Sequence, residues 1–316
     1  MRVAVTGGRG FIGARLVERL VAEGAKVRVL TRRKPTDNPL GIEFSEGDLT
    51  FPHSDLLRFV EGADVVYHCA AEIHDEHRMH AVNVLGTKRL IEAAQSRVGR
   101  WVQLSSVGVY GPISAGVVTE NQPEAPIGKY ECSKGAADTL VRMAVAEGAF
   151  SAVLLRPSNV YGPTMRNRSV FQLIRAVDRG IFFYIGRPGA AANYIHVDNV
   201  VEALIRSASA PHTDVDVYIL SDHRSLEDFV GTIAACLGRR APRSRLPAWL
   251  AQGAAIAGGW LPGFPLTMSR VRALTNRTVY STRRIEMKLG YSPVVTMEQG
   301  VCQMVDQLRS ETGQGA

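Results

Sequence analysis

The sequence lacks the features that mark several specialised classes of protein. Its four cysteines, Cys69, Cys132, Cys236 and Cys302, form no C-x-x-C pair, so neither a disulfide framework nor a zinc ribbon is indicated, and a reducing cytoplasm fits best. The opening MRVAVTGG is far shorter than the apolar core of a signal peptide. We therefore expect a cytoplasmic protein.

Long hydrophobic runs are also missing. The longest apolar stretch, 246–261, contains prolines and glycines and falls short of a membrane-spanning helix. It predicts a buried or lid-like helix in preference to membrane contact. There is no Walker loop, no nucleophile elbow and no His/Cys zinc spacing. The histidines of 74–80 predict a polar loop and not a metal site, because His80 drifts off the helical face that His74 and His77 would share.

Acidic residues are outnumbered by basic ones, 30 to 37, which gives a net charge of +7. Such a charge suits anionic partners, among them nucleic acid, a phosphorylated substrate or a phosphorylated cofactor. The strongest basic run, 238–245, lacks the interleaved aromatics of a nucleic-acid platform, so no nucleic-acid partner is expected.

What the sequence does have is a regular alternation of short β-branched runs with helical stretches. It predicts an α/β fold with a doubly wound parallel sheet of Rossmann type and a smaller, discontinuous C-terminal substrate domain. We predict that residues 1–162 and about 193–220 form the dinucleotide-binding domain. Residues of about 163–192 and 221–316 are assigned to the substrate domain.

A glycine-rich loop, TGGRGFIG, lies between the first strand and the first helix. Gly7 permits a tight turn, Gly10 lets backbone approach a pyrophosphate, and Gly13 lets the helix pack closely on the sheet. The helix N-terminus, with Phe11 and Ile12, supplies amide donors to the phosphates. The loop therefore predicts a dinucleotide site.

The end of the second strand identifies the adenosine ribose that such a site accepts. An acidic residue there would bind the ribose hydroxyls of NAD, but this sequence has Thr31, Arg32 and Arg33. Guanidinium groups can pair bidentately with a 2′-phosphate, so the sequence favours NADP and leaves NAD as the alternative.

Tyr130 and Lys134 lie one helical turn apart, and a nearby ammonium would lower the pKa of the phenol. Ser105 and Ser106 follow an earlier strand and stand at the carboxyl edge of the sheet, where ligands bind in open α/β folds. We predict that Tyr130 exchanges the proton, a hydroxyl at this edge polarises the reacting oxygen, and Lys134 lowers the pKa of the tyrosine.

In this combination the chain resembles an extended short-chain dehydrogenase/reductase of the NAD-dependent epimerase/dehydratase family. Matching segments run almost throughout, from TGGRGFIG through GDL at 47–49, HCAA at 68–71, the YxxxK pair and RPSNVYGP at 156–163 to KLGYSP at 288–293. The resemblance implies that Asp48 and Leu49 flank the adenine and that Ala70 and Ala71 line the dinucleotide cleft. It also implies a homodimer.

The same resemblance implies a substrate site that begins near Asn159, with Lys134 also holding the nicotinamide ribose. The resemblance also implies that Ser106 and not Ser105, by its spacing ahead of Tyr110, is the catalytic hydroxyl that polarises the reacting oxygen. Further candidates for substrate contacts are Ser106, Arg166, Asn193 and Arg272. Asn83 lies within a helix, where a structural hydrogen bond is at least as well supported as a role in the active site.

Two departures from the family narrow the reaction. Val107 and Gly108 stand where the sugar-nucleotide 4,6-dehydratases have Asp-Glu, so dehydration is not expected. Asn193 stands where many nucleotide-sugar enzymes have an arginine, which weakens that interpretation without removing it.

We predict an enzyme that moves hydride between NAD(P) and a secondary alcohol or ketone. The leading substrate is a nucleotide sugar, acted on by an epimerase or a 4-keto reductase. The alternative is an NADPH-dependent reductase of a steroid-like, flavonoid-like or long-chain ketone. A third hypothesis, a non-catalytic NADP-sensing or RNA-binding protein on the same fold, conflicts with the intact set of Ser106, Tyr130 and Lys134.

Overall fold

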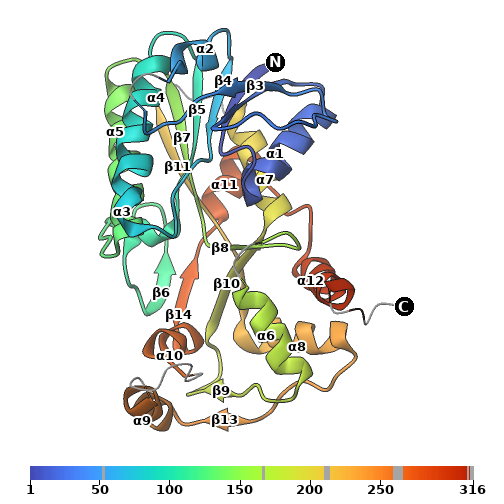
Figure 1. Ribbon diagram of the computed structural model, residues 1–316. Helices are drawn as coiled ribbons and strands as arrows, with labels where there is room; N and C mark the ends of the chain where they lie inside the picture. The colour runs from blue at the N-terminus through green and yellow to red at the C-terminus, as the bar shows by residue number, and fades with distance from the viewer. Residues whose placement is uncertain (52–53, 166–167, 210–213, 259–265, 312, 314–316) are drawn as a thin grey trace.

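The computed structural model describes the whole chain except residues 52–53, 166–167, 210–213, 259–265, 312 and 314–316. The strands of its central sheet are β1 (Arg2–Thr6), β2 (Lys26–Thr31), β3 (Glu43–Glu46), β4 (Val65–His68), β5 (Arg100–Leu104), β7 (Ser151–Pro157) and β11 (Val215–Leu220). They are ordered β11-β7-β5-β4-β1-β2-β3, and every neighbouring pair is parallel (Figure 1). The central strands are apolar and buried on both faces, as a parallel sheet between helical layers requires.

Helices cover both faces of this sheet. They are α1 (Phe11–Ala22), α2 (Leu56–Val60), α3 (Glu76–Met79), the π-helix η1 (His80–Leu85), α4 (Gly86–Ala94), α5 (Lys129–Ala146), α7 (Val197–Ala208) and α11 (Arg283–Leu289). On one face α1 and α7 bury Leu16 and Leu204, and on the other α4 and α5 bury Leu90 and Val141. The predicted doubly wound, Rossmann-type sheet is confirmed.

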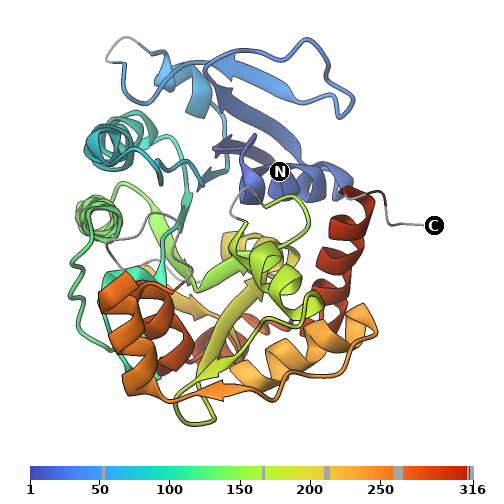
Figure 2. The same ribbon diagram turned by 60° about the horizontal axis from the view of Figure 1, so that its bottom comes forward.

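The remaining elements build a second, smaller part below the carboxyl edge of the sheet (Figure 1). They are η2 (Val107–Tyr110), β6 (Ala115–Val118), β8 (Asn159–Tyr161), α6 (Ser169–Asp178), β9 (Tyr184–Ile185), β10 (Ala191–His196), β12 (Asp222–Ser225), α8 (Leu226–Leu237), β13 (Arg245–Leu246), α9 (Ala248–Gly258), α10 (Met268–Thr275), β14 (Arg277–Tyr280) and α12 (Met297–Glu311). Helices α6, α8 and α12 share a core of their own around Phe229 and Val301. Figure 2 shows α9 and α10 at the periphery of this part.

The strands and helices expected in the first half are all present. Two elements had no clear periodic signal: β3, whose sequence EFSE is mostly polar because it is a half-exposed edge strand, and the short α2. The predicted domain boundaries stay a prediction, and the structure puts β11 at one edge of the central sheet and α7 on its face.

The apolar stretch 246–261 forms β13 and α9, and its last residues lie outside the described part. The expectation of a buried helix is wrong, because the side chains of Trp249 and Ile256 are 70% and 65% exposed. Only small residues of α9 face inward, among them Ala251 and Ala255. No helix in the described ranges combines the length and the apolar character that crossing a membrane requires.

The cysteine prediction needs a correction as well. Cys236 at the end of α8 and Cys302 in α12 form a disulfide, with their Cα atoms 5.3 Å apart, whereas Cys69 and Cys132 are free. The two cysteines are 66 residues apart in the sequence, so their spacing did not predict the bond. The packing of α8 against α12 brings them together. The argument for a reducing compartment from cysteine spacing is therefore lost, and a cytoplasmic location stays a prediction.

We predict that Cys302→Ser lowers the free energy of unfolding by about 2–5 kcal/mol, because the cross-link closes a long loop in the unfolded chain. Urea denaturation under non-reducing conditions measures the change. The matched control is Cys132→Ser, an exposed free cysteine, which should change stability by less than about 0.5 kcal/mol. Equal effects of the two substitutions would contradict the prediction.

Candidate active site

The loop between β1 and α1 is crowded enough to require its glycines. Gly7 has φ +68°, and a Cβ there would lie 2.7 Å from the amide nitrogen of Ala70. A Cβ on Gly13 would lie 2.2 Å from the carbonyl oxygen of Gly7. Gly13 therefore packs on the turn itself, and this contact supplements the packing on the sheet that the sequence suggested. Gly10 is the N-cap of α1, and its amide donates to Gly7 O at 2.8 Å.

A cleft of 860 Å³ opens beside this loop, at the carboxyl edge of the sheet. Most of the residues predicted to bind cofactor line it: Gly7, Gly10, Thr31, Arg32, Arg33, Asp48, Leu49, Ala70 and Ala71. Five others do not line it: Phe11, Ile12, Gly13, Tyr130 and Lys134. The side chains of Phe11 and Ile12 pack into two different cores. The first turn of α1 can therefore offer the cleft its backbone amides and not these side chains.

The end of β2 gives the cleft a cationic rim. Thr31 is buried and its hydroxyl donates to Arg33 O at 2.9 Å, which fixes the turn after the strand. Arg32 and Arg33 are exposed, and neither guanidinium has an ion-pair partner in the described part of the chain. Arg9, from the glycine loop, donates to Arg33 O at 3.2 Å and adds a third positive charge. This rim is suited to an anion.

Other predicted cofactor residues are held by local hydrogen bonds. One carboxylate oxygen of Asp48 accepts from the amide and the hydroxyl of Thr50, each at 2.8 Å. The amide of Ala70 donates to the Thr6 hydroxyl at 3.2 Å. These bonds fix the backbone on two sides of the cleft before any ligand enters.

Glu72 and Arg78 also line the cleft, and the sequence analysis did not single them out. A carboxylate oxygen of Glu72 accepts from the amides of His74, Ile73 and Asp75 at 3.0, 3.1 and 3.2 Å, and these bonds lower its pKa. The polar segment at 74–80 is thus a capped turn followed by α3, and within the described ranges no three His, Cys, Asp or Glu side chains cluster as metal ligands.

Asn83, in the π-helix, has a clear structural role. Its amide nitrogen donates to Glu72 O at 3.0 Å and to the Ser133 hydroxyl at 2.9 Å, and its amide oxygen accepts from the Glu72 amide at 2.7 Å. It therefore ties the loop after β4 to the first turns of α5. These bonds give Asn83 the structural role that the sequence analysis considered, and a role in the active site stays a prediction.

The three predicted catalytic residues come from two adjoining elements. Ser106 is the N-cap of η2, and its hydroxyl accepts from the Gly108 amide at 3.1 Å. Tyr130 and Lys134 lie on α5. Gly108 packs against Glu131, where a Cβ would approach the Glu131 side chain to 2.7 Å, so η2 lies directly on the first turn of α5.

Lys134 is buried, and its ammonium donates to Leu104 O, the last residue of β5, at 2.6 Å. Burial raises the pKa of Tyr130 to about 12, and the charges of Glu131 and Asp138 add to the effect. The prediction that Lys134 lowers this pKa is wrong for this structure, because its ammonium is directed to the strand carbonyl. Tyr130 is a protonated phenol at neutral pH and can donate a proton.

A buried ionic network lies under these residues. Asp138 accepts from the Ser105 hydroxyl at 2.7 Å and from the Arg156 guanidinium at 2.9 Å, and none of the three side chains is exposed. Burial raises the pKa of Asp138, against the opposing effects of Arg156 and Lys134. The network joins α5, β5 and β7. The sequence carried one signal for it, since Asp138 lies one turn beyond Lys134 on the same helix.

The predicted substrate residues are not brought together in the same way. Asn159 is exposed at the start of β8. Asn193 is buried and donates to Thr278 O at 2.7 Å, so it holds β10 to β14. Arg272 is exposed on α10 and does not line the cleft, and Arg166 lies outside the described residues.

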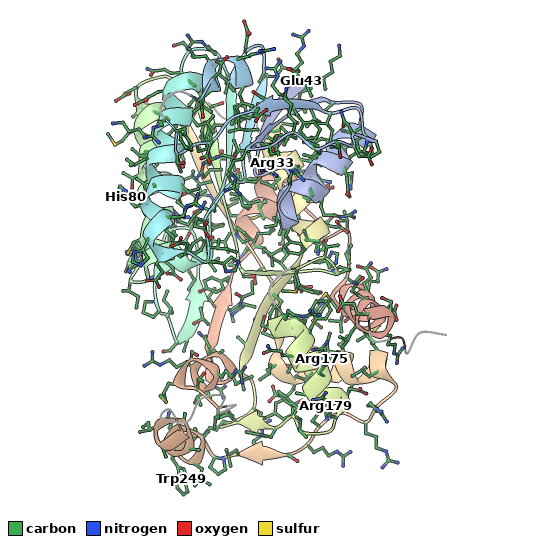
Figure 3. The ribbon with its side chains drawn as sticks, viewed as in Figure 1. Arg33, Glu43, His80, Arg175, Arg179 and Trp249 are labelled. Carbon is green, nitrogen blue, oxygen red and sulfur yellow. A yellow bond between two sulfur atoms is a disulfide. The ribbon has the colours of Figure 1, made fainter. Side chains whose placement is uncertain are left out.

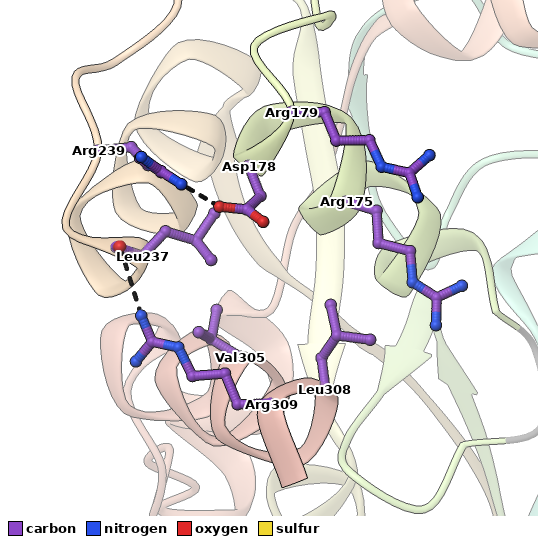
Figure 4. A pocket seen from close by; sticks show the side chains of 8 residues that line it. All are labelled: Arg175, Asp178, Arg179, Leu237, Arg239, Val305, Leu308 and Arg309. Carbon is purple, nitrogen blue, oxygen red and sulfur yellow. Dashed lines mark hydrogen bonds and ion pairs between the residues drawn. The ribbon is translucent and has the colours of Figure 1, made fainter. Parts of the chain in front are cut away.

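A second cavity, of 360 Å³, lies between α6, α8 and α12 (Figure 4). Its arginines are Arg175, Arg179, Arg239 and Arg309. Two of them are engaged: Arg239 pairs with Asp178 at 3.2 Å, and Arg309 donates to Leu237 O at 3.3 Å. No predicted site residue lines this cavity.

A family model for the NAD dependent epimerase/dehydratase family matches residues 3–220. The chain belongs to this family. It is an extended short-chain dehydrogenase/reductase, as the glycine loop and the YxxxK pair implied. The match covers the central sheet and ends where β11 ends.

The similar proteins include relatives found by sequence and solved structures. A 4-hydroxy-2-methyl-3-oxo-4-farnesyl-3,4-dihydroquinoline-1-oxide ketoreductase of Stigmatella aurantiaca is 29% identical over all of this chain and 98% of its own length. A decarboxylating sterol-4-alpha-carboxylate 3-dehydrogenase of Bos taurus is 30% identical over 95% of this chain and 90% of its own. Among solved structures, MoeE5 in complex with UDP-glucose and NAD is 27% identical over 99% of this chain and 100% of its own, with a TM-score of 0.76.

We predict that Asp138→Ala lowers the free energy of unfolding by about 3–5 kcal/mol, because it leaves buried Arg156 without its counter-charge. Urea denaturation measures the loss. Glu124, the half-exposed second partner of Arg156, provides the control, and Glu124→Ala should cost no more than about 1 kcal/mol. A loss below about 1 kcal/mol for Asp138→Ala would show that the network is not needed for stability.

Proposed function

We propose that the protein is an NADPH-dependent oxidoreductase that interconverts a ketone and a secondary alcohol on an apolar substrate. The observation that carries the proposal is that Asn83 bonds both to Glu72, which lines a cleft that fits a dinucleotide, and to Ser133 of α5, the helix that carries Tyr130 and Lys134. Ser106 caps η2, and Gly108 of η2 packs on Glu131 of α5, so the two segments that carry the hydroxyl and the phenol are in contact. A sensing or RNA-binding protein on this fold would not need the set of Ser106, Tyr130 and Lys134.

The cleft fits a dinucleotide on structural grounds. Gly7 and Gly13 stand where no side chain could, so the backbone forms a tight cradle at the N-terminus of α1. When bound, NADPH would supply the hydride. Tyr130, kept neutral by burial, donates the proton to the carbonyl oxygen, and the Ser106 hydroxyl donates a hydrogen bond to that same oxygen. The ammonium of Lys134 donates to Leu104 O and so places a positive charge at the end of β5.

The preference for NADP rests on the cationic rim of Arg9, Arg32 and Arg33. A 2′-phosphate on the adenosine ribose would pair with these guanidinium groups, whereas the residues directly after β2, Arg32, Arg33 and Lys34, include no acidic side chain to bind the free hydroxyls of NAD. NAD remains the alternative cofactor, since MoeE5 is described in complex with it.

Exposed apolar side chains near Tyr130 support the apolar substrate. Ile127, in the loop before α5, is 76% exposed, and Ile73, in the loop after β4, is 54% exposed. The Lys129–Glu76 ion pair, at 2.7 Å, joins the two segments that carry these side chains. The curated relatives described above, whose names specify farnesylated quinoline and sterol substrates, agree with this choice.

The second candidate is a nucleotide-sugar epimerase, the substrate class that the sequence analysis put first. The similarity to MoeE5 favours it. Asn193, the residue at the position of the family's diphosphate arginine, is bonded to β14, which weakens it. Mass spectrometry of the purified protein separates the two: retained NAD favours the epimerase, and a site that fills with added NADPH favours the reductase.

We predict that Tyr130→Phe reduces ketone turnover at least about a hundredfold while NADPH still binds, because the variant lacks the proton donor. Consumption of NADPH with a bicyclic decalone and with geranylacetone measures turnover, and fluorescence titration measures binding. With a pKa of about 12, Tyr130 stays protonated, so kcat/KM for reduction should not fall between about pH 6 and 10 through its titration.

Two results would contradict this assignment. Turnover by Tyr130→Phe at the wild-type rate would remove the tyrosine from the mechanism. Conversion of UDP-glucose to UDP-galactose without turnover of either ketone would replace the reductase by the epimerase. Met143→Leu, on the solvent side of the same helix, is the matched control and should leave both readouts unchanged.

We predict that NADPH binds more tightly than NADH and that Arg32→Ala narrows the ratio of the two dissociation constants about tenfold, since one charge-assisted contact to the 2′-phosphate is lost. Titration of both cofactors into both proteins measures the ratio. Arg97→Ala, an exposed arginine outside the cleft, is the control. An unchanged ratio would show that Arg32 does not contact the phosphate.

A further inference from the structure

The excess of basic over acidic residues in this chain comes from one segment. From Arg239 to Ile285 there is no acidic residue and no lysine, but there are nine arginines, at positions 239, 240, 243, 245, 270, 272, 277, 283 and 284. Without these nine, the chain has 28 basic and 30 acidic residues, so the excess of +7 comes entirely from this segment. It follows α8 and contains β13, α9, α10 and β14.

Helix α9, within this segment, has the reverse of the usual amphipathic pattern of a surface helix, which buries its large apolar side chains. None of its 11 residues is charged. Its inward face consists of small residues, Ala251 and Ala255, which pack on Val271 of α10 and Ile185 of β9. Its large apolar side chains point to solvent: Trp249, Leu250 and Ile256 are 70%, 40% and 65% exposed. Trp249 and Ile256 are two turns apart and share one face.

This exposed apolar surface lies at the end of the molecule opposite β3 and α2. Figures 1 and 2 show α9 at the periphery, and Figure 3 shows the side chain of Trp249 directed away from the body of the protein. Ile181 and Phe183, 64% and 37% exposed, lie at the same end just before β9, whose partner strand β13 leads into α9. Scattered apolar side chains are ordinary on a surface, but several large ones gathered at one end of the molecule mark an interaction site.

The arginines next to α9 fall into two kinds. Arg239 and Arg245 are engaged by carboxylates of α6 and α8. Arg239 pairs with Asp178 at 3.2 Å (Figure 4), and Arg245 pairs with Glu227 at 2.8 Å. Arg240 and Arg243 are exposed and have no ion-pair partner in the described part of the chain. Two uncompensated guanidinium groups therefore stand just before the exposed apolar helix.

We propose that this end of the protein, with Trp249, Leu250 and Ile256 of α9 and the adjoining Arg240 and Arg243, docks on an anionic lipid bilayer. An uncharged apolar helix face beside basic side chains is the pattern of an interfacial helix, and tryptophan lies well at the boundary between headgroups and acyl chains. The arginines pair with lipid phosphates. An apolar substrate dissolved in the bilayer would then be presented to the enzyme, but the docking itself does not depend on the proposed reaction.

Co-sedimentation with vesicles tests the docking without any turnover, so its failure and failure of the proposed reaction are separate results. Wild-type protein should bind vesicles of phosphatidylcholine with about a third phosphatidylglycerol, and bind pure phosphatidylcholine at least about tenfold more weakly. Trp249→Ser/Ile256→Ser should weaken binding at least about tenfold through lost apolar burial. Arg240→Ser/Arg243→Ser should weaken binding to the anionic vesicles about tenfold to thirtyfold.

The matched control is Leu57→Ser/Arg58→Ser, which removes an exposed apolar side chain and an arginine from α2 at the opposite end. It should bind like the wild type. Urea denaturation checks that the variants fold. If Trp249→Ser/Ile256→Ser does not fold, Arg240→Ser/Arg243→Ser still tests the docking.

Three results would overturn the proposal. One is no binding of the wild type to anionic vesicles. Another is a concentration-dependent dimer in sedimentation velocity that Trp249→Ser/Ile256→Ser abolishes, which would make a second copy the occupant. The third is an increase in KM for geranylacetone in that variant with unchanged vesicle binding, which would make α9 a substrate lid.

Discussion

The buried carboxylate of Asp138 is the point on which the active site depends. It accepts from Arg156 of β7 and Ser105 after β5, and it lies one turn from Lys134 on α5. The helix that carries Tyr130, the candidate catalytic tyrosine, is thereby fixed against the ends of two strands. Removing one charge from such a network leaves the others buried without compensation, so the arrangement tolerates little displacement.

That constraint has a chemical consequence for Tyr130. Burial of the phenol raises the pKa of Tyr130 to about 12, and the charges of Glu131 and then of Asp138 add to this effect. The residue is thereby kept as a proton donor, which suits reduction of a ketone. Lys134 supports the arrangement from below through Leu104 O. Position and protonation state of the tyrosine therefore have a common origin in the packing of α5 on the sheet.

The second, smaller part of the molecule is stabilised in a different way and presents a different surface. Its core, around α6, α8 and α12, is cross-linked by Cys236–Cys302. Its far end carries an uncharged helix with alanines inside and Trp249 outside. The dinucleotide half is nearly neutral, whereas the positive charge of the chain lies in the segment that contains this helix. The two ends of the protein therefore present different surfaces: a polar cleft at one, and exposed apolar side chains of α9, preceded in the chain by arginines, at the other.

The sequence by itself determined the central sheet, the glycine loop and the identity of the three catalytic candidates, because each rests on local rules. Strand and helix periodicity, the absence of a side chain at Gly7, and the one-turn spacing of Tyr130 and Lys134 require no knowledge of distant contacts. The cationic rim after β2 was equally local.

Only the tertiary structure decided the rest. The disulfide joins residues 66 positions apart, Asn193 is engaged by a carbonyl of β14, and the ammonium of Lys134 is directed to a strand end. The orientation of α9 also belongs here, because hydrophobic composition predicts burial, while which face meets the core depends on the elements packed against it. Whether a charge is paired or an apolar face is buried depends on contacts with residues far away in the sequence, and local sequence patterns do not specify these contacts.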